Sequence, residues 1–283
     1  MTKKLIHFDW AIKRLLRNKA NFVVLEGFLS ELLFDDIKIK NIIESEGNQE
    51  DENDKYNRVD ILTENSKNEL IIIEIQNTYE IDYFQRMTYG VSKSLSENFK
   101  LGQKYSEVKK VISISIVYFD LGQGEDYIYK GTTNFKGLHQ KDILELSSNQ
   151  KKKFLKENIS DIFPEYYLLK VNQFNDIAKD TLDEWMYFLK NSEVKDEFKA
   201  KGLKEAGDVL DIMRLTKDDQ YGYNRYMEFL SYKASEMFTI ETEAEFKLIE
   251  LIKNAINEGL DNIVISKITK YPIEKIEQIR NEK

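Results

Sequence analysis

Apolar and polar residues alternate with a period of two in three early segments, and this pattern predicts a β-meander. The three segments are Ile37–Ile43, Tyr56–Thr63 and Glu69–Gln76. Alternation of this kind is typical of strands that bury one face. The second and third segments flank Asn65-Ser66-Lys67-Asn68, whose residue types favour a tight turn. We therefore expect these two segments to form a β-hairpin.

Segments with a helical period surround the meander and alternate with further strands. The predicted helices of this region are Leu5–Arg17, Phe22–Phe34 and Asp82–Phe99. The run Val108–Phe119 is rich in β-branched residues, which favours a buried strand. Two shorter segments, Tyr127–Thr133 and Glu165–Val171, predict additional strands. Helices on both sides of a mixed β-sheet predict an α/β fold.

Only helical patterns follow residue 174, so we expect a domain boundary there. The helical segments are Leu182–Leu189, Leu203–Leu215, Tyr226–Phe238 and Glu243–Asn257. Residues 1–174 would form the α/β domain and residues 175–283 an all-helical C-terminal region. The tail, residues 258–280, predicts two short helices around Tyr271-Pro272. These helices form either a helix-turn-helix or a hairpin that caps the helical region.

The predicted hairpin carries charged and amide side chains where the rest of its second strand is apolar. Because side chains of a strand alternate between its faces, Arg58 and Asp60 lie on one side of the first strand, and Glu74 and Gln76 lie on one side of the second. A turn centred near Lys67 places Asp60 across from Glu74 and Arg58 across from Gln76. Two carboxylates would then converge in apolar surroundings, where an unpaired charge is costly. Mg²⁺ or Mn²⁺ is the simplest partner, because hard cations prefer carboxylate, amide and water oxygens.

The order of these residues resembles the PD-(D/E)XK phosphodiesterase superfamily, whose core is an Asp, a hairpin and then Glu-x-Lys. The chain is most similar to the branch with Gln in the Lys position, the recombination-promoting nuclease and putative transposase group. The resemblance covers roughly the first 150 residues, and three further segments carry it: LEGFLSELL from Leu25 to Leu33, DYFQRMTYGVSKSL from Asp82 to Leu95, and KKVISISIVYFDL from Lys109 to Leu121.

The resemblance implies a restriction-endonuclease-like core that hydrolyses phosphodiester bonds in DNA and acts in recombination or on mobile elements. Asp60, Glu74 and the carbonyl of Ile75 would hold the cation, which lowers the pKa of a water molecule and neutralises charge on the phosphate. Gln76 stands where the superfamily has its Lys, so it can orient water but carries no charge.

The missing positive charge needs a source, and two arginines can supply it. Arg58 lies opposite Gln76 in the predicted register, and Arg86 lies on the helix that follows the hairpin. The resemblance implies that this helix lines the cleft, so Gln85 and Arg86 are candidate substrate-binding residues.

The superfamily also tends to carry an acidic residue on its first core helix, directed at the metal. Glu26 and Glu31 are the two candidates here. At about 100° per residue, Glu26 lies about 90° from the centre of the apolar face and Glu31 about 130°. Glu26 is therefore the better candidate for a further ligand through water, and an ordinary surface carboxylate is the alternative.

Composition limits the classes of protein without choosing among them. The chain has 283 residues, no cysteine, two histidines and a net charge of −8. Disulfide frameworks and thiolate metal sites are therefore excluded, and a zinc site has few ligands. The first residues lack a signal peptide and no run reaches the ~18 apolar residues of a membrane span, so we expect a cytoplasmic protein. The acidic balance predicts weak non-specific binding to DNA, and a homo-oligomer is compatible with these residues.

Three functions fit the sequence. The first is a Mg²⁺-dependent DNA endonuclease, and the second is ribonuclease activity at the same site. The third is a nucleic-acid-binding or protein-binding module that keeps the fold but has lost catalysis with the missing Lys. In that case Asp60, Glu74 and Gln76 would form a structural polar cluster.

Overall fold

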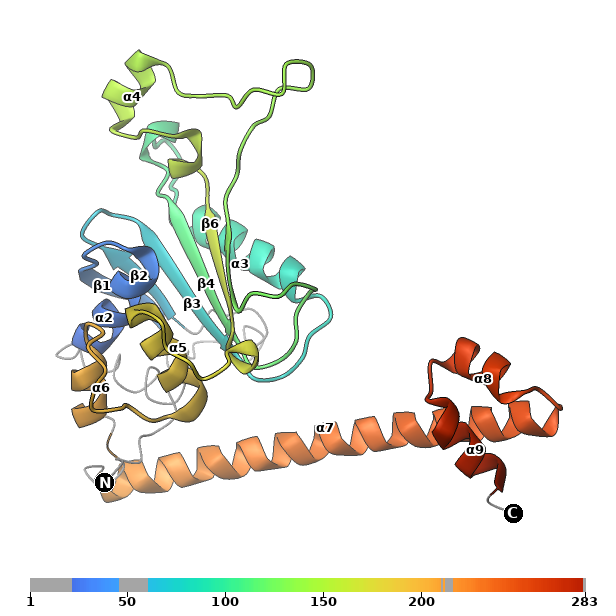
Figure 1. Cartoon of the computed structure of the whole chain (residues 1–283). Coiled ribbons are helices and arrows are strands. Elements are labelled where there is room, and N and C mark those ends of the chain that lie inside the picture. The colour runs from blue at the N-terminus through green and yellow to red at the C-terminus, as the bar shows by residue number, and fades with distance from the viewer. Residues whose placement is uncertain (1–21, 46–60, 210, 212–215, 282–283) are drawn as a thin grey trace. The chain divides into compact units, whose positions relative to one another are not determined.

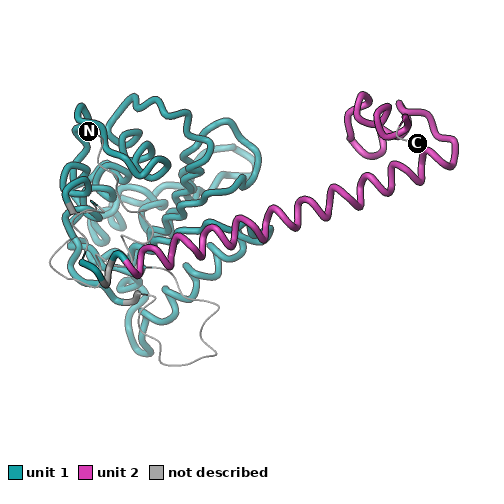
Figure 2. The backbone as a smooth tube through the Cα atoms, turned by 90° about the horizontal axis from the view of Figure 1, so that it is seen from below, with its two compact units in different colours: residues 1–220 teal, residues 221–283 magenta. Residues whose placement is uncertain are grey.

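The computed structural model describes residues 22–45, 61–209, 211 and 216–281 (Figure 1). These divide into two compact units, which comprise residues 1–220 and 221–283 (Figure 2). The predicted helix Leu5–Arg17, Arg58 and Asp60 lie outside the described residues.

A six-stranded mixed sheet forms the centre of the first unit. Its strands are β1 (Ile39–Ser45), β2 (Ile61–Asn65), β3 (Leu70–Gln76), β4 (Val111–Val117), β5 (Ile128–Gly131) and β6 (Glu165–Lys170). The order across the sheet is β1-β2-β3-β4-β6-β5. The first three strands form the predicted antiparallel meander, β3, β4 and β6 run parallel, and β5 closes the edge antiparallel to β6. The α/β fold predicted from the sequence is thereby confirmed.

The hairpin of β2 and β3 has the predicted register over the part that the structure describes. Ile61 pairs with Ile73 and Leu62 with Ile72. The Asn65 side chain fixes the turn, because its Oδ1 accepts hydrogen bonds from the backbone N–H groups of Lys67 (3.0 Å) and Glu69 (2.9 Å). Such Asx contacts are the reason that Asn favours turns.

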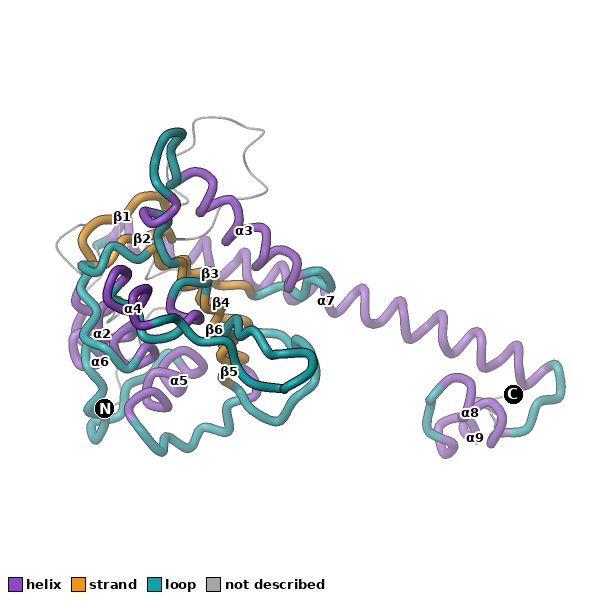
Figure 3. Tube along the Cα trace, turned by 90° about the horizontal axis from the view of Figure 1, so that it is seen from above, coloured by secondary structure: helices purple, strands orange, loops and turns teal. Residues whose placement is uncertain are grey.

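Helices cover both faces of the sheet. The helices of this unit are α2 (Phe22–Leu33), α3 (Tyr83–Glu97), α4 (Ser148–Phe154), α5 (Thr181–Asn191) and α6 (Leu203–Val209). Seen from above, α3 lies on one face, and α2, α5 and α6 lie on the other (Figure 3). On the α3 face, Val91 packs with Leu62 and Ile72 in one buried cluster. The even-numbered residues of β3 therefore face α3.

The opposite face is closed by aromatic packing between α2 and α5. The rings of Phe28 and Trp185 meet edge to face with centroids 5.5 Å apart, and both side chains are fully buried. The turn before α6 approaches α2 so closely that a Cβ on Gly27 would clash with the backbone of Lys201 and Gly202. The structure thus divides the chain later than the expected boundary at residue 174, because α5 and α6 pack on α2.

The second unit is helical, as the sequence predicts, but one expected break is absent. The segments predicted over 226–238 and 243–257 belong to one helix, α7 (Lys217–Asn257). The residues between them contain neither Gly nor Pro, and the Thr239 and Thr242 hydroxyls donate to the carbonyls four residues earlier (2.8 and 2.7 Å). Nothing there interrupts helical hydrogen bonding.

Two short helices follow α7, as predicted. They are α8 (Asn262–Thr269) and α9 (Ile273–Asn281), and they pack on the last turns of α7 through a core of Ile252, Ile265 and Ile276. Among the described helices, none has the length and apolar character needed to cross a membrane.

The pairing of Glu64 gives a test of the sheet's stability. Glu64 is 7% exposed and accepts hydrogen bonds from Lys109 (2.8 Å) and Lys40 (3.2 Å), and these bonds hold its pKa below the ordinary value despite its burial. A lowered pKa in the folded state stabilises the protein above pH ~4.3 and loses this effect as the pH falls further. Glu64→Gln should therefore reduce the free energy of unfolding by about 1–3 kcal/mol at pH 7.

The same experiment at low pH provides its control. At pH 3.5, urea denaturation should give wild type and Glu64→Gln closer free energies of unfolding than at pH 7. A difference that stays constant between these pH values would show that the ion pairs of Glu64 do not stabilise the sheet.

Candidate active site

Glu74 is the one charged residue in the second strand of the hairpin, and it is buried. Every residue of β3 from Leu70 to Ile75 is buried, and Glu74 is 7% exposed. Its side chain faces α3, where the Tyr83 hydroxyl donates to Glu74 Oε2 over 3.4 Å. Glu74 thus lies near the carboxyl end of β3, and such ends of parallel strands commonly form ligand sites in α/β folds.

Gln76 ends the same strand and is held by the loop that follows it. The Gln76 amide nitrogen donates to the carbonyl of Thr78 (3.3 Å) and to Glu80 Oε1 (2.7 Å). Because the nitrogen has two acceptors, the amide oxygen is the atom that can accept a hydrogen bond from water.

Glu80 links Gln76 to the arginine that the sequence selected. The same Oε1 atom of Glu80 accepts a hydrogen bond from Arg86 Nη1 at 2.8 Å. Burial of the Arg86 guanidinium acts to lower its pKa, but attraction by Glu74 and the bond to Glu80 outweigh this effect, so the pKa of Arg86 is raised. A fixed positive charge therefore stands beside both Glu74 and Gln76.

Aromatic contacts hold the loop that carries Glu80. Phe119, just after β4, meets the ring of Tyr79 edge to face at 5.6 Å and that of Tyr83 at 5.8 Å. Since Tyr79 and Tyr83 flank Glu80 in the chain, these contacts fix the loop on both sides of it.

A buried hydroxyl lies next to Glu74 on the neighbouring strand. Ser115 is paired with Glu74 in the parallel register of β3 and β4, and both face α3. Ser115 is fully buried, and its hydroxyl has no hydrogen-bond partner in the described part of the chain. Buried polar atoms are normally satisfied, so an unsatisfied one beside a carboxylate marks a place for a bound group.

The structure brings together some of the sequence-predicted site residues and separates others. Gln76 and Arg86 are joined through Glu80, and Arg86 is attracted by Glu74. Ile75 lies between Glu74 and Gln76 in the chain, and Gln85 is exposed on α3. The expectation that Asp60 and Arg58 lie across from Glu74 and Gln76 stays a prediction, because both lie outside the described residues.

Glu26 lies apart from this group. Its Oε1 accepts a hydrogen bond from the backbone N–H of Ile39 (2.9 Å), and its Oε2 pairs with Lys38 (3.1 Å). Ile39 pairs with Asn65 at the turn end of the hairpin, and roughly 13 Å of β3 separates that end from Glu74. In this structure Glu26 anchors the start of β1, and we leave it out of the site.

Sequence reasoning missed Glu80, Tyr83 and Ser115. Glu80 lies in a loop of six residues between β3 and α3, where no periodicity assigns a direction to its side chain. Tyr83 and Ser115 lie in segments already predicted as helix and strand. Period-two alternation applied to β4 pairs Ser115 with Glu74 once the strands are known to be parallel and in this register.

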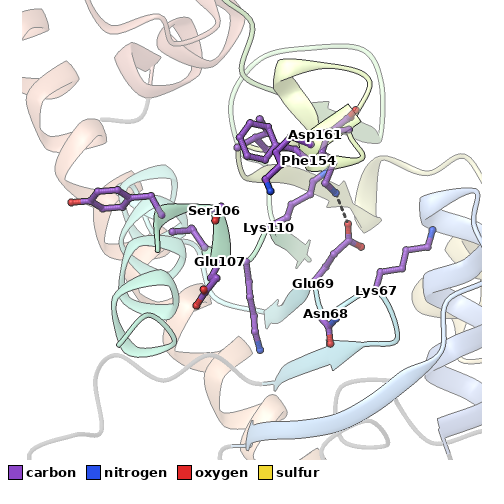
Figure 4. A pocket seen from close by; sticks show the side chains of 14 residues that line it. Lys67, Asn68, Glu69, Ser106, Glu107, Lys110, Phe154 and Asp161 are labelled. Carbon is purple, nitrogen blue, oxygen red and sulfur yellow. Dashed lines mark ion pairs between the residues drawn. The ribbon is translucent and has the colours of Figure 1, made fainter. Parts of the chain in front are cut away.

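A cavity lies at the other end of the sheet, and its lining residues differ in kind from the group around Glu74. It has a volume of about 660 Å³, and five of its lining residues are lysines: Lys67, Lys109, Lys110, Lys153 and Lys156 (Figure 4). All but Lys153 pair with carboxylates, including Lys156 with Glu69 at 3.7 Å, the ion pair drawn in Figure 4. This cavity shares no lining residue with the group around Glu74, Gln76 and Arg86.

Comparison with known families agrees with the geometry. A family model described as PD-(D/E)XK nuclease family transposase matches residues 6–240, and the chain therefore belongs to this family. Searches of curated proteins and of solved structures gave no match. The family supports a phosphodiester hydrolase with a nucleic-acid substrate, and its nucleases generally use divalent metal ions.

The donors at the carboxyl end of β3 fit such an ion. A carboxylate, a carbonyl oxygen and a hydroxyl, those of Glu74, Ile75 and Ser115, are the hard oxygen donors that Mg²⁺ and Mn²⁺ prefer. Within the described ranges no group of three His, Cys, Asp or Glu residues is arranged to hold a metal, so Glu74 needs a further ligand, for which Asp60 is the candidate.

Thermal unfolding tests the metal site without any assay of activity. We expect Mg²⁺ or Mn²⁺ at 100 times its Kd to stabilise the wild type by about 2.7 kcal/mol, because the ion binds the folded state. The double variant Asp60→Ala, Glu74→Ala should show no such rise in Tm. Glu107→Ala, which removes an exposed carboxylate at the far cavity, is the matched control and should respond like the wild type. Equal shifts in all three proteins would contradict the assignment.

Proposed function

We propose that this protein is a metal-dependent endonuclease that hydrolyses phosphodiester bonds in DNA. The observation that carries the proposal is the contact of Gln76 and Arg86 through Glu80, beside the buried carboxylate of Glu74. Together these residues supply an acceptor for water, a positive charge for phosphate and a ligand for a cation. Those are the groups that phosphodiester hydrolysis requires.

Each residue has a separate role in the proposed reaction. Asp60, Glu74 and the carbonyl of Ile75 would hold a divalent cation, Mg²⁺ or Mn²⁺, which when bound would lower the pKa of water and neutralise charge on the phosphate. Gln76 orients the attacking water through its amide oxygen. Arg58 and Gln85 bind the substrate strand.

Arg86 supplies the positive charge that the amide of Gln76 lacks. Its guanidinium is held by Glu80, and attraction by Glu74 raises its pKa further above the ordinary value. A guanidinium fixed in this way needs no reorganisation when charge develops on the phosphate oxygens, and such preorganised groups stabilise a transition state most effectively.

Two alternative functions make different predictions for a cleavage experiment. A binding module on this fold would bind DNA and leave it intact, and a ribonuclease would cleave RNA in preference to DNA. No residue at the described site selects between the two sugars, so the preference for DNA rests on the family.

Cleavage by purified protein tests the proposal. With Mg²⁺, the wild type should nick supercoiled plasmid DNA and cleave a fluorescent DNA oligonucleotide. Glu74→Gln and Asp60→Asn should each lower the rate by about 10²- to 10³-fold or more, because each removes a ligand charge with little change of shape. Glu26→Gln is the control and should cleave at a rate within a fewfold of the wild type.

The outcomes separate the three functions. Binding of DNA without cleavage under all metal conditions would contradict the endonuclease and favour the module. Faster cleavage of an RNA oligonucleotide of the same sequence would favour the ribonuclease.

A further inference from the structure

An apolar groove lies between α3 and the edge of the sheet formed by β5 and β6. Its volume is about 320 Å³. The residues that matter for its chemistry are Phe84, Met87, Tyr129, Gly131, Tyr166 and Leu168. Three of these have aromatic rings, and they come from three different elements or their flanking loops.

The groove has a buried floor and accessible aromatic walls. Met87 is 6% exposed and Leu168 is 8% exposed, so they form the floor. Phe84 is 49% exposed, while Tyr129 and Tyr166 are half-buried. The Tyr129 hydroxyl accepts a hydrogen bond from the backbone N–H of Asp126 (2.9 Å), which orients this ring. Flat, fixed and partly exposed rings are suited to stacking on another ring.

The one cationic residue that lines the groove directs its charge elsewhere. Lys130 Nζ lies 3.6 Å from Glu165 Oε2 and 5.3 Å from the ring centroid of Tyr167. Tyr167 alternates with Tyr166 along β6, so it lies on the opposite face of the sheet. The groove therefore does not present a lysine ammonium to a phosphate, and its chemistry is that of an apolar, aromatic slot.

The groove lies near the candidate active site. Met87 and Leu168 belong to the same buried cluster as Tyr83, the residue that donates to Glu74. In the sheet, Glu74 pairs with Ser115, and Ser115 pairs with Leu168. Two strand spacings of about 4.8 Å therefore place Leu168, at the floor of the groove, roughly 10 Å from Glu74. Adjacent nucleotides of one strand can reach both places.

The substrate class identifies the occupant. In a nucleic acid the bases are the flat, apolar groups, and aromatic side chains bind them by stacking. Bases inside a duplex are already stacked and paired, so only an unpaired or flipped base can enter a groove. We propose that this groove binds an unpaired nucleobase next to the scissile phosphate. The inference rests on the proposed nuclease function and specifies its substrate as DNA with an unpaired nucleotide at the cleavage site.

Binding measured in EDTA tests the groove apart from hydrolysis. The probe is a single-stranded DNA oligonucleotide with one 2-aminopurine, whose fluorescence changes when the base stacks. The wild type should bind it with such a change, and more tightly than a blunt duplex of the same sequence. Phe84→Ala should raise Kd about five- to hundredfold, the range expected when one base–aromatic stack is lost.

A second variant fills the groove and leaves its aromatic rings in place. A Cβ on Gly131 would lie 3.5 Å from the Tyr166 Cβ, an ordinary contact, so the backbone accepts a side chain there. Gly131→Val should raise Kd as Phe84→Ala does, while both variants unfold as cooperatively as the wild type. The matched control is Tyr105→Ala, which removes an aromatic ring that is 90% exposed at the far cavity, and it should bind like the wild type.

The outcomes separate the groove from the reaction. If the wild type cleaves DNA while both groove variants keep its Kd and its fluorescence change, the groove proposal is overturned and the nuclease stands. If the wild type binds and cleaves no nucleic acid, the proposed function fails and the groove proposal fails with it. Equal affinity of the wild type for duplex and single-stranded DNA would also overturn the proposal that the groove binds an unpaired base.

Discussion

The burial of one carboxylate near the end of an apolar strand determines the rest of this site. Strand β3 is buried from Leu70 to Ile75, and Glu74 lies within that run. A carboxylate taken out of water is costly unless hydrogen bonds and opposite charge compensate it. Tyr83 and Arg86 of α3 contribute to that compensation. The fold thus places the carboxylate on the face of the sheet that α3 covers, where these partners reach it.

In the proposed reaction, the Gln at position 76 requires another residue to supply the positive charge. A Lys there would carry its own charge on a flexible chain, whereas Gln76 reaches an arginine only through Glu80. The position of Glu80 depends on Tyr79, Tyr83 and Phe119, so packing around Phe119 controls the electrostatics of the site. In the proposed reaction, such a site would divide the water-orienting and charge-supplying roles between two side chains. It also ties both roles to the loop between β3 and α3.

Sequence reasoning succeeded where a local period specifies geometry. The hairpin register follows from alternation and an Asn turn, and the described pairs of β2 and β3 have that register. Local periods say less where long-range contacts decide. The helical position of Glu26 does not predict its hydrogen bond with the backbone of Ile39 at the start of β1. The same limit applies to α5, whose docking through Trp185 on Phe28 no periodicity reveals. The aromatic groove also joins residues from distant segments that only the sheet order brings together.

A double-mutant cycle shows whether Arg86 performs the electrostatic role proposed for it in place of the missing Lys. Cleavage rates would be measured at saturating DNA and Mg²⁺ for the wild type, Arg86→Gln, Gln76→Lys and the double variant. We expect Arg86→Gln to lower the rate by about 10²- to 10³-fold and Gln76→Lys to restore most of this loss, because either cation can serve the phosphate. If Gln76→Lys changes the rate by the same factor in the wild type and in Arg86→Gln, and so gives no specific rescue, Arg86 does not perform this role.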